Sequence, residues 1–168
     1  MTLSMYEASA PRFASMLNNL DAILAKAQAH ATAKKIDPAV LLGSRLFPDM
    51  FPLMRQVQIA TDHAKGAVAR LAGVELPKYD DTEQSFEEIR ARLAKTIAFV
   101  ESFKAAQIDG SEGKEISLKV GGQERSFDGM NYLIGFALPN FYFHLVTAYN
   151  ILRHNGVEIG KRDYMNNP

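Results

Sequence analysis

The chain has 168 residues, of which 47% are hydrophobic and 23% charged, and its 19 Lys and Arg residues balance 19 Asp and Glu residues. This length is typical of a single domain, here residues 1–168, that buries about 70% of its unfolded surface. A zero net charge and the lack of a basic cluster interleaved with aromatics argue against nucleic-acid binding. The sequence contains no cysteine, which excludes disulfides, a thiolate nucleophile and cysteine-ligated metals.

The sequence also lacks a run of about 18 apolar residues, so we expect no membrane span. Its first stretch, MTLSMYEASAPRF, does not have the charged segment and continuous apolar core of a signal peptide. A soluble cytoplasmic protein is the expectation that follows.

Apolar residues that recur every three or four positions predict a first long helix from near Ser4 to about Ala31. Ser4 and Glu7, three residues apart, have the spacing of a capping box. Pro11 is expected to bend the first turns, because proline does not fit a helix interior.

Residues 34–49 form a connector before the second helix, and Phe47 is expected to pack beneath it. The second helix is predicted at Met50–Ala72, with Asp49 as its N-cap and Pro52 in the first turn, where proline is tolerated. Polar side chains are mixed into this otherwise apolar helix: Gln56, Gln58, Asp62 and His63.

The third helix is predicted to begin at Thr82, where acidic residues suit the positive end of the helix dipole. An apolar stripe at helical spacing follows and indicates one buried face. The charged face, which includes Arg90 and Arg92, is interpreted as a solvated surface.

Residues 109–128 interrupt the helical pattern. Glu115–Val120 alternates polar and apolar residues, Gly121-Gly122 follows, and Gln123–Phe127 has the pattern of a return strand, which together predict a β-hairpin. A lone hairpin is marginal in water, so we expect it to pack on the helices or on a partner. The predicted fold is all-α, an antiparallel four-helix bundle with a small β-hairpin before the last helix.

The last helix, predicted to begin near Asp128, carries the residues best suited to chemistry. Asn140 and His144 are four residues apart and therefore share a face, while their apolar neighbours indicate burial on several sides. An unpaired buried amide or imidazole costs about 1–3 kcal/mol, so each needs a partner: a metal, a ligand, a water or another helix. Pro139 is expected to cause a bend or a fresh start, and the tail from Gly160 either folds back or is disordered.

Other motifs narrow the chemistry. Aromatic residues around His144, among them Tyr142, either line an apolar ligand pocket between helices or belong to the core. The sequence has no glycine-rich phosphate loop and no Gly-x-Ser-x-Gly nucleophile motif. Paired carboxylates at helical spacing on an apolar face are also missing, which disfavours a di-iron bundle.

The register of the last helix points to a family. His144 is followed by Ile151-Leu152-Arg153 and then by Gly156-Val157. This pattern resembles the last helix of the DinB/YfiT-like superfamily of metal-dependent four-helix bundles, which carries an H-x-x-x-H pair before such an ending. The resemblance places His144 at the second histidine of the pair and Asn140 at the first.

The second helix extends the resemblance. In that superfamily it supplies a further histidine about three turns before an R-L-x-G ending, which here is Arg70-Leu71-Ala72-Gly73. The nearest position holds Gln58, with Asp62 and His63 one turn later. Together, the second and last helices look like one branch of the superfamily that is known as a domain of unknown function. The resemblance implies a DinB-type bundle and, often, a homodimer.

Two functional hypotheses follow. In the first, a divalent ion such as zinc or nickel is held by His144 with His63, Asn140, Gln58 or Asp62, in an enzyme of the thiol-transferase type that the resemblance suggests. In the second, a metal-free homodimer is structural or binds a small ligand in a residual polar pocket, with Gln58, Asp62, Asn140 and Tyr142 as candidate contacts. We favour the second, because amides at two of the three histidine positions remove most of the affinity for zinc or nickel.

Overall fold

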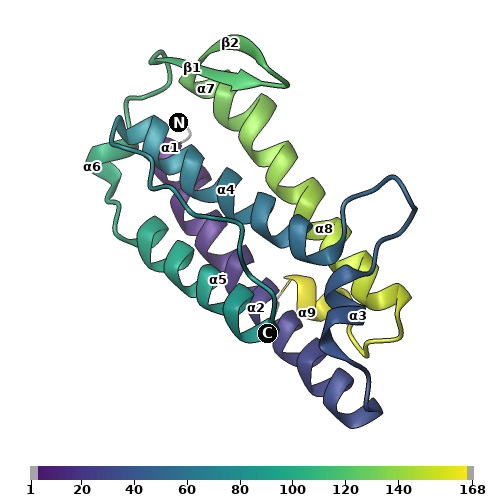
Figure 1. Cartoon of the computed structure of the whole chain (residues 1–168). Helices are drawn as coiled ribbons and strands as arrows, with labels where there is room; N and C mark the ends of the chain where they lie inside the picture. The colour runs from purple at the N-terminus through teal and green to yellow at the C-terminus, as the bar shows by residue number, and fades with distance from the viewer. Residues whose placement is uncertain (1–3, 166–168) are drawn as a thin grey trace.

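The computed structural model describes residues 4–165 and is mostly helical, with one antiparallel hairpin (Figure 1). The predicted combination of helices with a single hairpin is confirmed. The long helices are α2 (Ala10–Lys34), α4 (Leu53–Ala72), α5 (Phe86–Glu101) and α8 (Leu138–His154). Short helices accompany them: α1 (Met5–Ala8), α3 (Pro38–Gly43), α6 (Ala105–Ile108), α7 (Gly129–Asn131) and α9 (Lys161–Met165). The long helix α4 packs against both α5 and α8, and α2 packs against α5.

The first predicted helix is interrupted near its start. The Ser4 side chain accepts a hydrogen bond from the Glu7 N–H, at 3.0 Å, and so caps α1 as predicted. The backbone leaves helical geometry at Ser9, and α2 then begins with Pro11 in its first turn. The disturbance expected at Pro11 is therefore a break just before it, because proline is preorganised for the first turn of a new helix.

Two helix starts lie later in the chain than predicted. Pro52 is extended (φ −70°, ψ 166°) and precedes α4, which begins at Leu53 rather than inside the connector. The Ser85 hydroxyl accepts a hydrogen bond from the Glu88 N–H at 3.1 Å, so α5 begins at Phe86. In both cases the residue before the helix fixes an extended backbone, which helical periodicity alone does not reveal.

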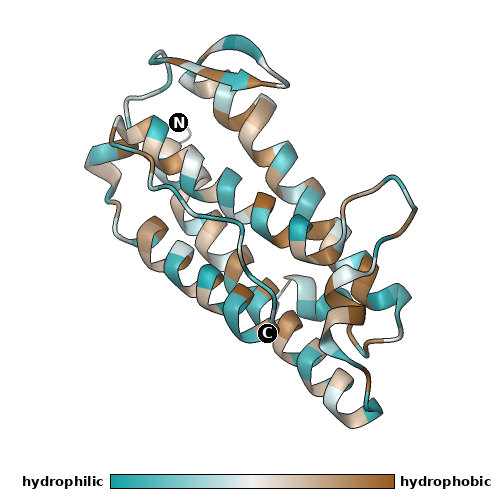
Figure 2. Ribbon diagram, viewed as in Figure 1, coloured by the Kyte–Doolittle hydropathy of each residue, from teal (hydrophilic) through white to brown (hydrophobic). Residues whose placement is uncertain are grey.

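Two predictions of burial are wrong. Phe47 is 63% exposed instead of packed beneath the connector. Arg92, assigned to a solvated face, is only 4% exposed. The environment of Arg92 depends on the α4–α5 connector, and that of Phe47 depends on the α3–α4 connector, to which it belongs. Helical spacing in the sequence does not encode the paths of these connectors. Figure 2 shows apolar residues on the α3–α4 connector as well as along the inner faces of the helices.

The hairpin forms at the predicted residues. Strand β1 (Glu115–Val120) pairs antiparallel with β2 (Gln123–Asp128), and Val120 lies opposite Gln123. The two residues between them, Gly121 and Gly122, have φ of 58° and 82°, the left-handed backbone that a tight hairpin turn requires. One face of the hairpin packs on the helices, since Ile116 is 4% exposed.

The chain passes from the hairpin into α8 through a π-helical segment, η1 (Tyr132–Ala137). There the Leu138 N–H donates to the Leu133 carbonyl, five residues back. Pro139 has no N–H to donate and its ring crowds the carbonyl four residues earlier. The expected disturbance at Pro139 is thus a wide turn ahead of the proline, and the helix continues through it.

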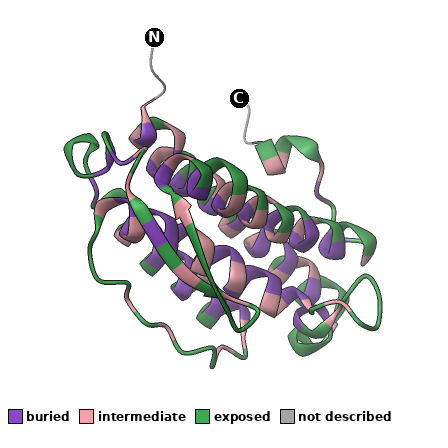
Figure 3. Cartoon of the chain, turned by 90° about the horizontal axis from the view of Figure 1, so that it is seen from above, coloured by how far each residue is buried: buried purple, intermediate pink, exposed green. Residues whose placement is uncertain are grey.

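The buried residues lie mainly on the sides of the long helices that face one another (Figure 3). Phe13 of α2 meets Phe141 of α8 edge to face, with ring centroids 4.9 Å apart. The C-terminal segment folds back onto α2, where the Asn19 amide donates to the Tyr164 carbonyl at 2.9 Å. Among residues 4–165, none of the helices is both long and apolar enough to cross a membrane.

Candidate functional site

Two histidines meet where α4 packs on α8. The rings of His63 and His144 lie nearly parallel, at 13°, with centroids 5.9 Å apart. Nδ1 of His144 is 2.7 Å from Oε1 of Gln56. Gln56 and His63 are seven residues apart, two helical turns, and therefore lie on the same face of α4. The structure thus brings together the two histidines that the sequence singled out.

The hydrogen bonds fix the tautomer of His144. The Gln56 amide nitrogen donates to the Phe51 carbonyl at 3.0 Å, which turns its oxygen toward the imidazole. Nδ1 of His144 therefore carries the proton, and Nε2 keeps a lone pair that can accept a hydrogen bond.

Both imidazoles are neutral at pH 7. Burial first, and then the nearby His144 and Arg70, lower the pKa of His63 to about 4, with Asp62 opposing them only in part. Burial, followed by the charge of Arg55, lowers the pKa of His144. Each ring consequently offers one donor and one acceptor, and neither offers a full charge.

A proton titration followed by NMR checks this environment. The ring resonances of His63 are expected to titrate near pH 4, and His144→Gln should raise that midpoint, because at acid pH protonated His144 repels the charge that His63 gains. Because the unfolded state has the higher pKa, it binds the proton first. His63 should therefore cost stability as the pH falls from about 6.5 toward 4 and should contribute no pH dependence above that range. An unshifted midpoint would contradict the buried, paired arrangement.

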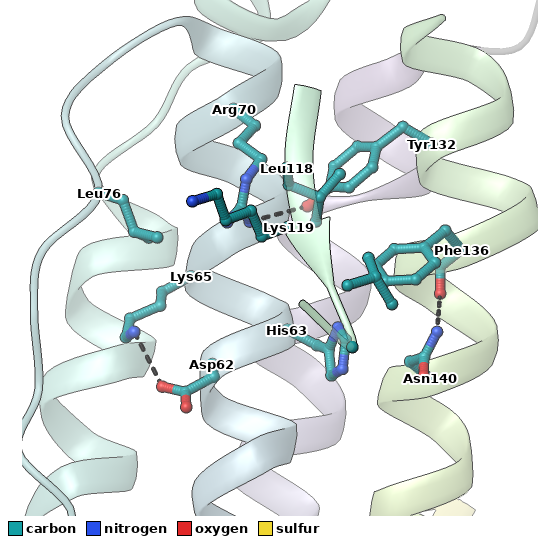
Figure 4. A pocket seen from close by; sticks show the side chains of 12 residues that line it. Asp62, His63, Lys65, Arg70, Leu76, Leu118, Lys119, Tyr132, Phe136 and Asn140 are labelled. Atoms are coloured by element: carbon teal, nitrogen blue, oxygen red, sulfur yellow. Dashed lines mark hydrogen bonds and ion pairs between the residues drawn. The ribbon is translucent and has the colours of Figure 1, made fainter. Parts of the chain in front are cut away.

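A pocket of about 460 Å³ opens beside His63. Its wall is built by α4, by η1 and the start of α8, by the end of β1, and by the connector after α4 (Figure 4). Aromatic and aliphatic side chains supply much of the surface, among them Leu76, Leu118 and Phe136. Phe136 also meets the His63 ring edge to face, with centroids 5.8 Å apart.

Asn140 lines this pocket one turn before His144. Its amide nitrogen donates to the carbonyl of Phe136 at 2.7 Å, within the stretch where the helix widens (Figure 4). Its side-chain oxygen is the remaining polar group and is an acceptor. The position that resembles a histidine in the superfamily therefore carries an amide whose nitrogen is hydrogen-bonded within the helix and whose oxygen is an acceptor.

Gln58 and Asp62 belong to a different cluster. The Gln58 amide donates to Oε2 of Glu83 at 2.8 Å. Oδ1 of Asp62 accepts from Arg92 at 2.9 Å and pairs with Lys65 at 2.8 Å. Both side chains thus serve the α4–α5 side of α4, although Asp62 also borders the pocket. The structure does not bring Gln58 to His144.

Tyr142 is also separated from the histidines. It is two residues before His144, which on a helix is roughly 200° around the axis. Its ring meets Phe141 edge to face at 5.3 Å. Burial raises the pKa of its phenol, and the nearby charge of Arg12, at the start of α2, lowers it in part. Tyr142 therefore faces α2 and does not line this pocket.

The donor set does not fit a three-ligand metal centre. Within residues 4–165, no three His, Asp or Glu side chains are placed so that they could hold one ion. Catalytic zinc sites use three protein ligands and an open position. Here two imidazoles adjoin, one of them already hydrogen-bonded to Gln56, and the amides near them are weak ligands for zinc or nickel.

Two features of the site were not predicted as part of it. Gln56 was noted only as a polar residue of the helix, yet its spacing of two turns from His63 indicates a shared face. Arg70 was noted only within the R-L-x-G ending, but its guanidinium donates to the Tyr132 hydroxyl at 3.0 Å on the pocket wall. The partner of Arg70 lies 62 positions away, and sequence spacing gives no signal for such a pair.

Comparisons with known proteins agree with this architecture. Residues 5–165 match the family described as "Domain of unknown function (DUF1993)". The crystal structure of a DinB family member protein from Shewanella denitrificans is similar, with a TM-score of 0.88 and 45% sequence identity over 97% of this chain and 92% of that one. No curated protein matches the chain. The chain therefore belongs to the DUF1993 family, a DinB-like family of unknown function.

Proposed function

We propose that the protein binds a small organic molecule in the pocket beside His63 and acts as a homodimer in the cytoplasm. The observation that carries the proposal is the pocket itself, about 460 Å³ in volume and lined by both apolar and polar side chains. Small-molecule sites are typically concave, largely apolar, and provided with a few convergent polar groups.

The polar groups are suited to orienting a ligand. The neutral His63 ring and the Asn140 carbonyl oxygen offer hydrogen bonds from two different helices. A neutral imidazole can donate and accept at once, so it can contact a hydroxyl, an amide or a carbonyl. Buried hydrogen-bonding groups such as these discriminate strongly against ligands that cannot form hydrogen bonds with them.

The proposed homodimer has support from the surface. Phe143 on α8 is 58% exposed, and Phe47 and Phe51 on the α3–α4 connector are 63% and 55% exposed. Large exposed apolar side chains are typical of protein contact sites when they form one patch. Light scattering during size-exclusion chromatography measures the mass directly, and twice the 18.6 kDa of one chain is expected.

A thermal-shift screen with small organic molecules tests binding. A ligand at about 100 times its dissociation constant should stabilise the protein by roughly 2.7 kcal/mol. The stabilisation should be lost in His63→Ala and retained in His154→Ala, since His154 is an exposed residue in the last turn of α8. Equal stabilisation of both variants would place the ligand elsewhere, and no stabilisation by any compound would remove the proposal.

The second candidate is a divalent-metal-dependent enzyme of the thiol-transferase type. The observation that favours it is the pair of adjoining neutral imidazoles, His63 and His144, because neutral imidazole is the form that binds metals. Elemental analysis of protein purified without a histidine tag separates the two candidates. Stoichiometric zinc or nickel that is lost in His144→Ala would support the enzyme. Protein that remains folded and metal-free, with no thermal shift on adding divalent ions, would support the small-molecule-binding function instead.

A further inference from the structure

The guanidinium of Arg70 is held at the pocket wall by two structural features. Its Nη1 donates to the hydroxyl of Tyr132 at 3.0 Å, and its carbon lies 5.9 Å from the centre of that ring. Tyr132 is 1% exposed, so this anchor is fixed by the core. Figure 4 shows the hydrogen bond that joins the two side chains beside the pocket.

The second feature is a glycine one turn earlier on α4. A Cβ placed on Gly66 would lie 2.4 Å from Nη1 of Arg70, so any larger side chain would displace the guanidinium. Glycine inside a helix costs about 1 kcal/mol relative to alanine. The chain accepts this cost in the buried middle of α4, and the guanidinium fills the space that results.

Arg70 differs from the other sheltered arginines in its lack of a carboxylate partner. Four arginines among the described residues are at least partly buried: Arg55, Arg70, Arg90 and Arg92. Arg55 pairs with Asp81, Arg90 with Asp21, and Arg92 with several acids, whereas across residues 4–165 no acidic side chain forms an ion pair with Arg70. A sheltered guanidinium without a counter-ion is a ready site for an anion.

The rest of the pocket wall favours the same charge. Lys119, near the end of β1, is a second cation on the wall. The acidic residue there, Asp62, is already paired with Lys65 and Arg92. The one acidic side chain on the pocket wall is therefore compensated on the α5 side, whereas within residues 4–165 neither Arg70 nor Lys119 forms an ion pair, although Glu124 lies opposite Lys119 in the hairpin register.

We propose that the pocket takes a small organic carboxylate, whose carboxyl group pairs with Arg70 and Lys119 and whose apolar body lies against Phe136 and the neutral His63. This inference rests on the proposed small-molecule function and names the class of ligand. Arg70 and His63 are seven residues apart on one face of α4, roughly 10 Å along its axis. A ligand with a carboxylate at one end and a ring or short chain behind it spans that distance.

A carboxylate suits the site better than a phosphate. Guanidinium binds both anions through paired N–H groups. Phosphate sites, however, are usually completed by a run of backbone N–H groups at a helix start or a glycine-rich nest. Arg70 lies near the end of α4 instead, and the neighbouring wall is aliphatic and aromatic.

Isothermal titration calorimetry on the full chain tests the inference with matched probes. The probes are benzoate, 4-phenylbutanoate and hexanoate, each compared with the alcohol of the same skeleton, and inorganic phosphate. The acids are expected to bind roughly 10- to 100-fold more tightly than their alcohols, the effect of one charge-assisted hydrogen-bonded contact. Arg70→Met should abolish that preference, and Lys119→Met should weaken it and reduce its dependence on salt.

Two further variants keep the test decisive if Arg70→Met does not fold. Gly66→Ala leaves the charge but displaces the guanidinium, so it should also reduce the preference for acids. Arg153→Met removes an exposed charge on α8 and should leave binding unchanged. Equal binding of acids and alcohols in the parent protein would overturn the carboxylate while sparing small-molecule binding. Tighter binding of phosphate than of every acid would also overturn it, and no binding by either class would remove the proposed function as well.

Discussion

Arg92→Met is expected to lower the free energy of unfolding by about 1–3 kcal/mol, because it leaves the largely buried Glu83 carboxylate and the Thr61 hydroxyl without their charged donor. The Arg92 side chain is 2% exposed and lies 2.9 Å from Asp62, 3.0 Å from Asp81 and 3.1 Å from Glu83. Its Nε also donates to the Thr61 hydroxyl at 2.8 Å. Urea denaturation followed by circular dichroism measures the change.

Arg90→Met is the matched control on the same helix. Arg90 forms a two-bond pair with Asp21, but the two side chains are 36% and 32% exposed. Exposed pairs contribute about 0–1 kcal/mol, so this variant should unfold nearly as the parent does. Comparable losses in the two variants would show that the buried network around Arg92 is not special. For Arg92→Met, limited proteolysis should also detect the loss of stability, as faster cleavage in the α4–α5 connector.

Gly129→Ala is expected to destabilise the protein by roughly 3 kcal/mol, the upper part of the range for overpacking. A Cβ on Gly129 would lie 1.9 Å from the carbonyl oxygen of Ser111 and 3.0 Å from its carbon, and both atoms are backbone. The following residue is fixed as well, since the Met130 N–H donates to the Glu112 carbonyl at 2.9 Å. Neither chain segment can move aside without breaking the contact between the loop before β1 and the start of α7.

Gly135→Ala tests the same substitution where space is available. No atom lies within 4 Å of a Cβ placed on Gly135, which is exposed in η1. Alanine there should be neutral or stabilise by up to about 1 kcal/mol. Thermal unfolding of both variants gives the comparison, and a stable Gly129→Ala protein would contradict the close approach at Ser111.

Local signals in the sequence predicted the elements well. Gly121-Gly122 between alternating residues indicated the hairpin, and the structure has it at those positions. Ser4 indicated a cap, and it caps α1. These patterns depend only on residues that are neighbours in the chain, so they predict the local structure without knowledge of the tertiary contacts. The long connectors have no such signal, and for that reason Phe47 was misplaced.

The sequence placed residues of the site only where their position around the helix axis was enough to place them. His63 and His144 meet as the packing of the second and last helices suggested. The family register pointed to Gln58, whereas the glutamine that bonds His144 is Gln56, on the face of α4 that turns to α8. A difference of two residues reverses the side of a helix, and the sequence does not fix how far each helix rotates in the bundle.

Charged residues were the hardest to place. Arg92 follows the period of an exposed face, but the connector from α4 covers it and brings the acids Asp81 and Glu83. Arg70 receives its partner from a helix that begins after the hairpin. Partners so distant in the chain are set by topology, which periodicity does not contain.

The π-helical segment η1 changes the direction in which side chains point around the helix axis between the residues before it and those after it. A turn with one additional residue rotates what precedes it by roughly 100° relative to an unbroken α-helix. With that offset, Tyr132 and Phe141 are both directed inward, at 1% and 0% exposure. A helix one residue shorter here would keep the inward stripe of α8 but swing Tyr132 toward water, and the guanidinium it steadies would lose its hydroxyl.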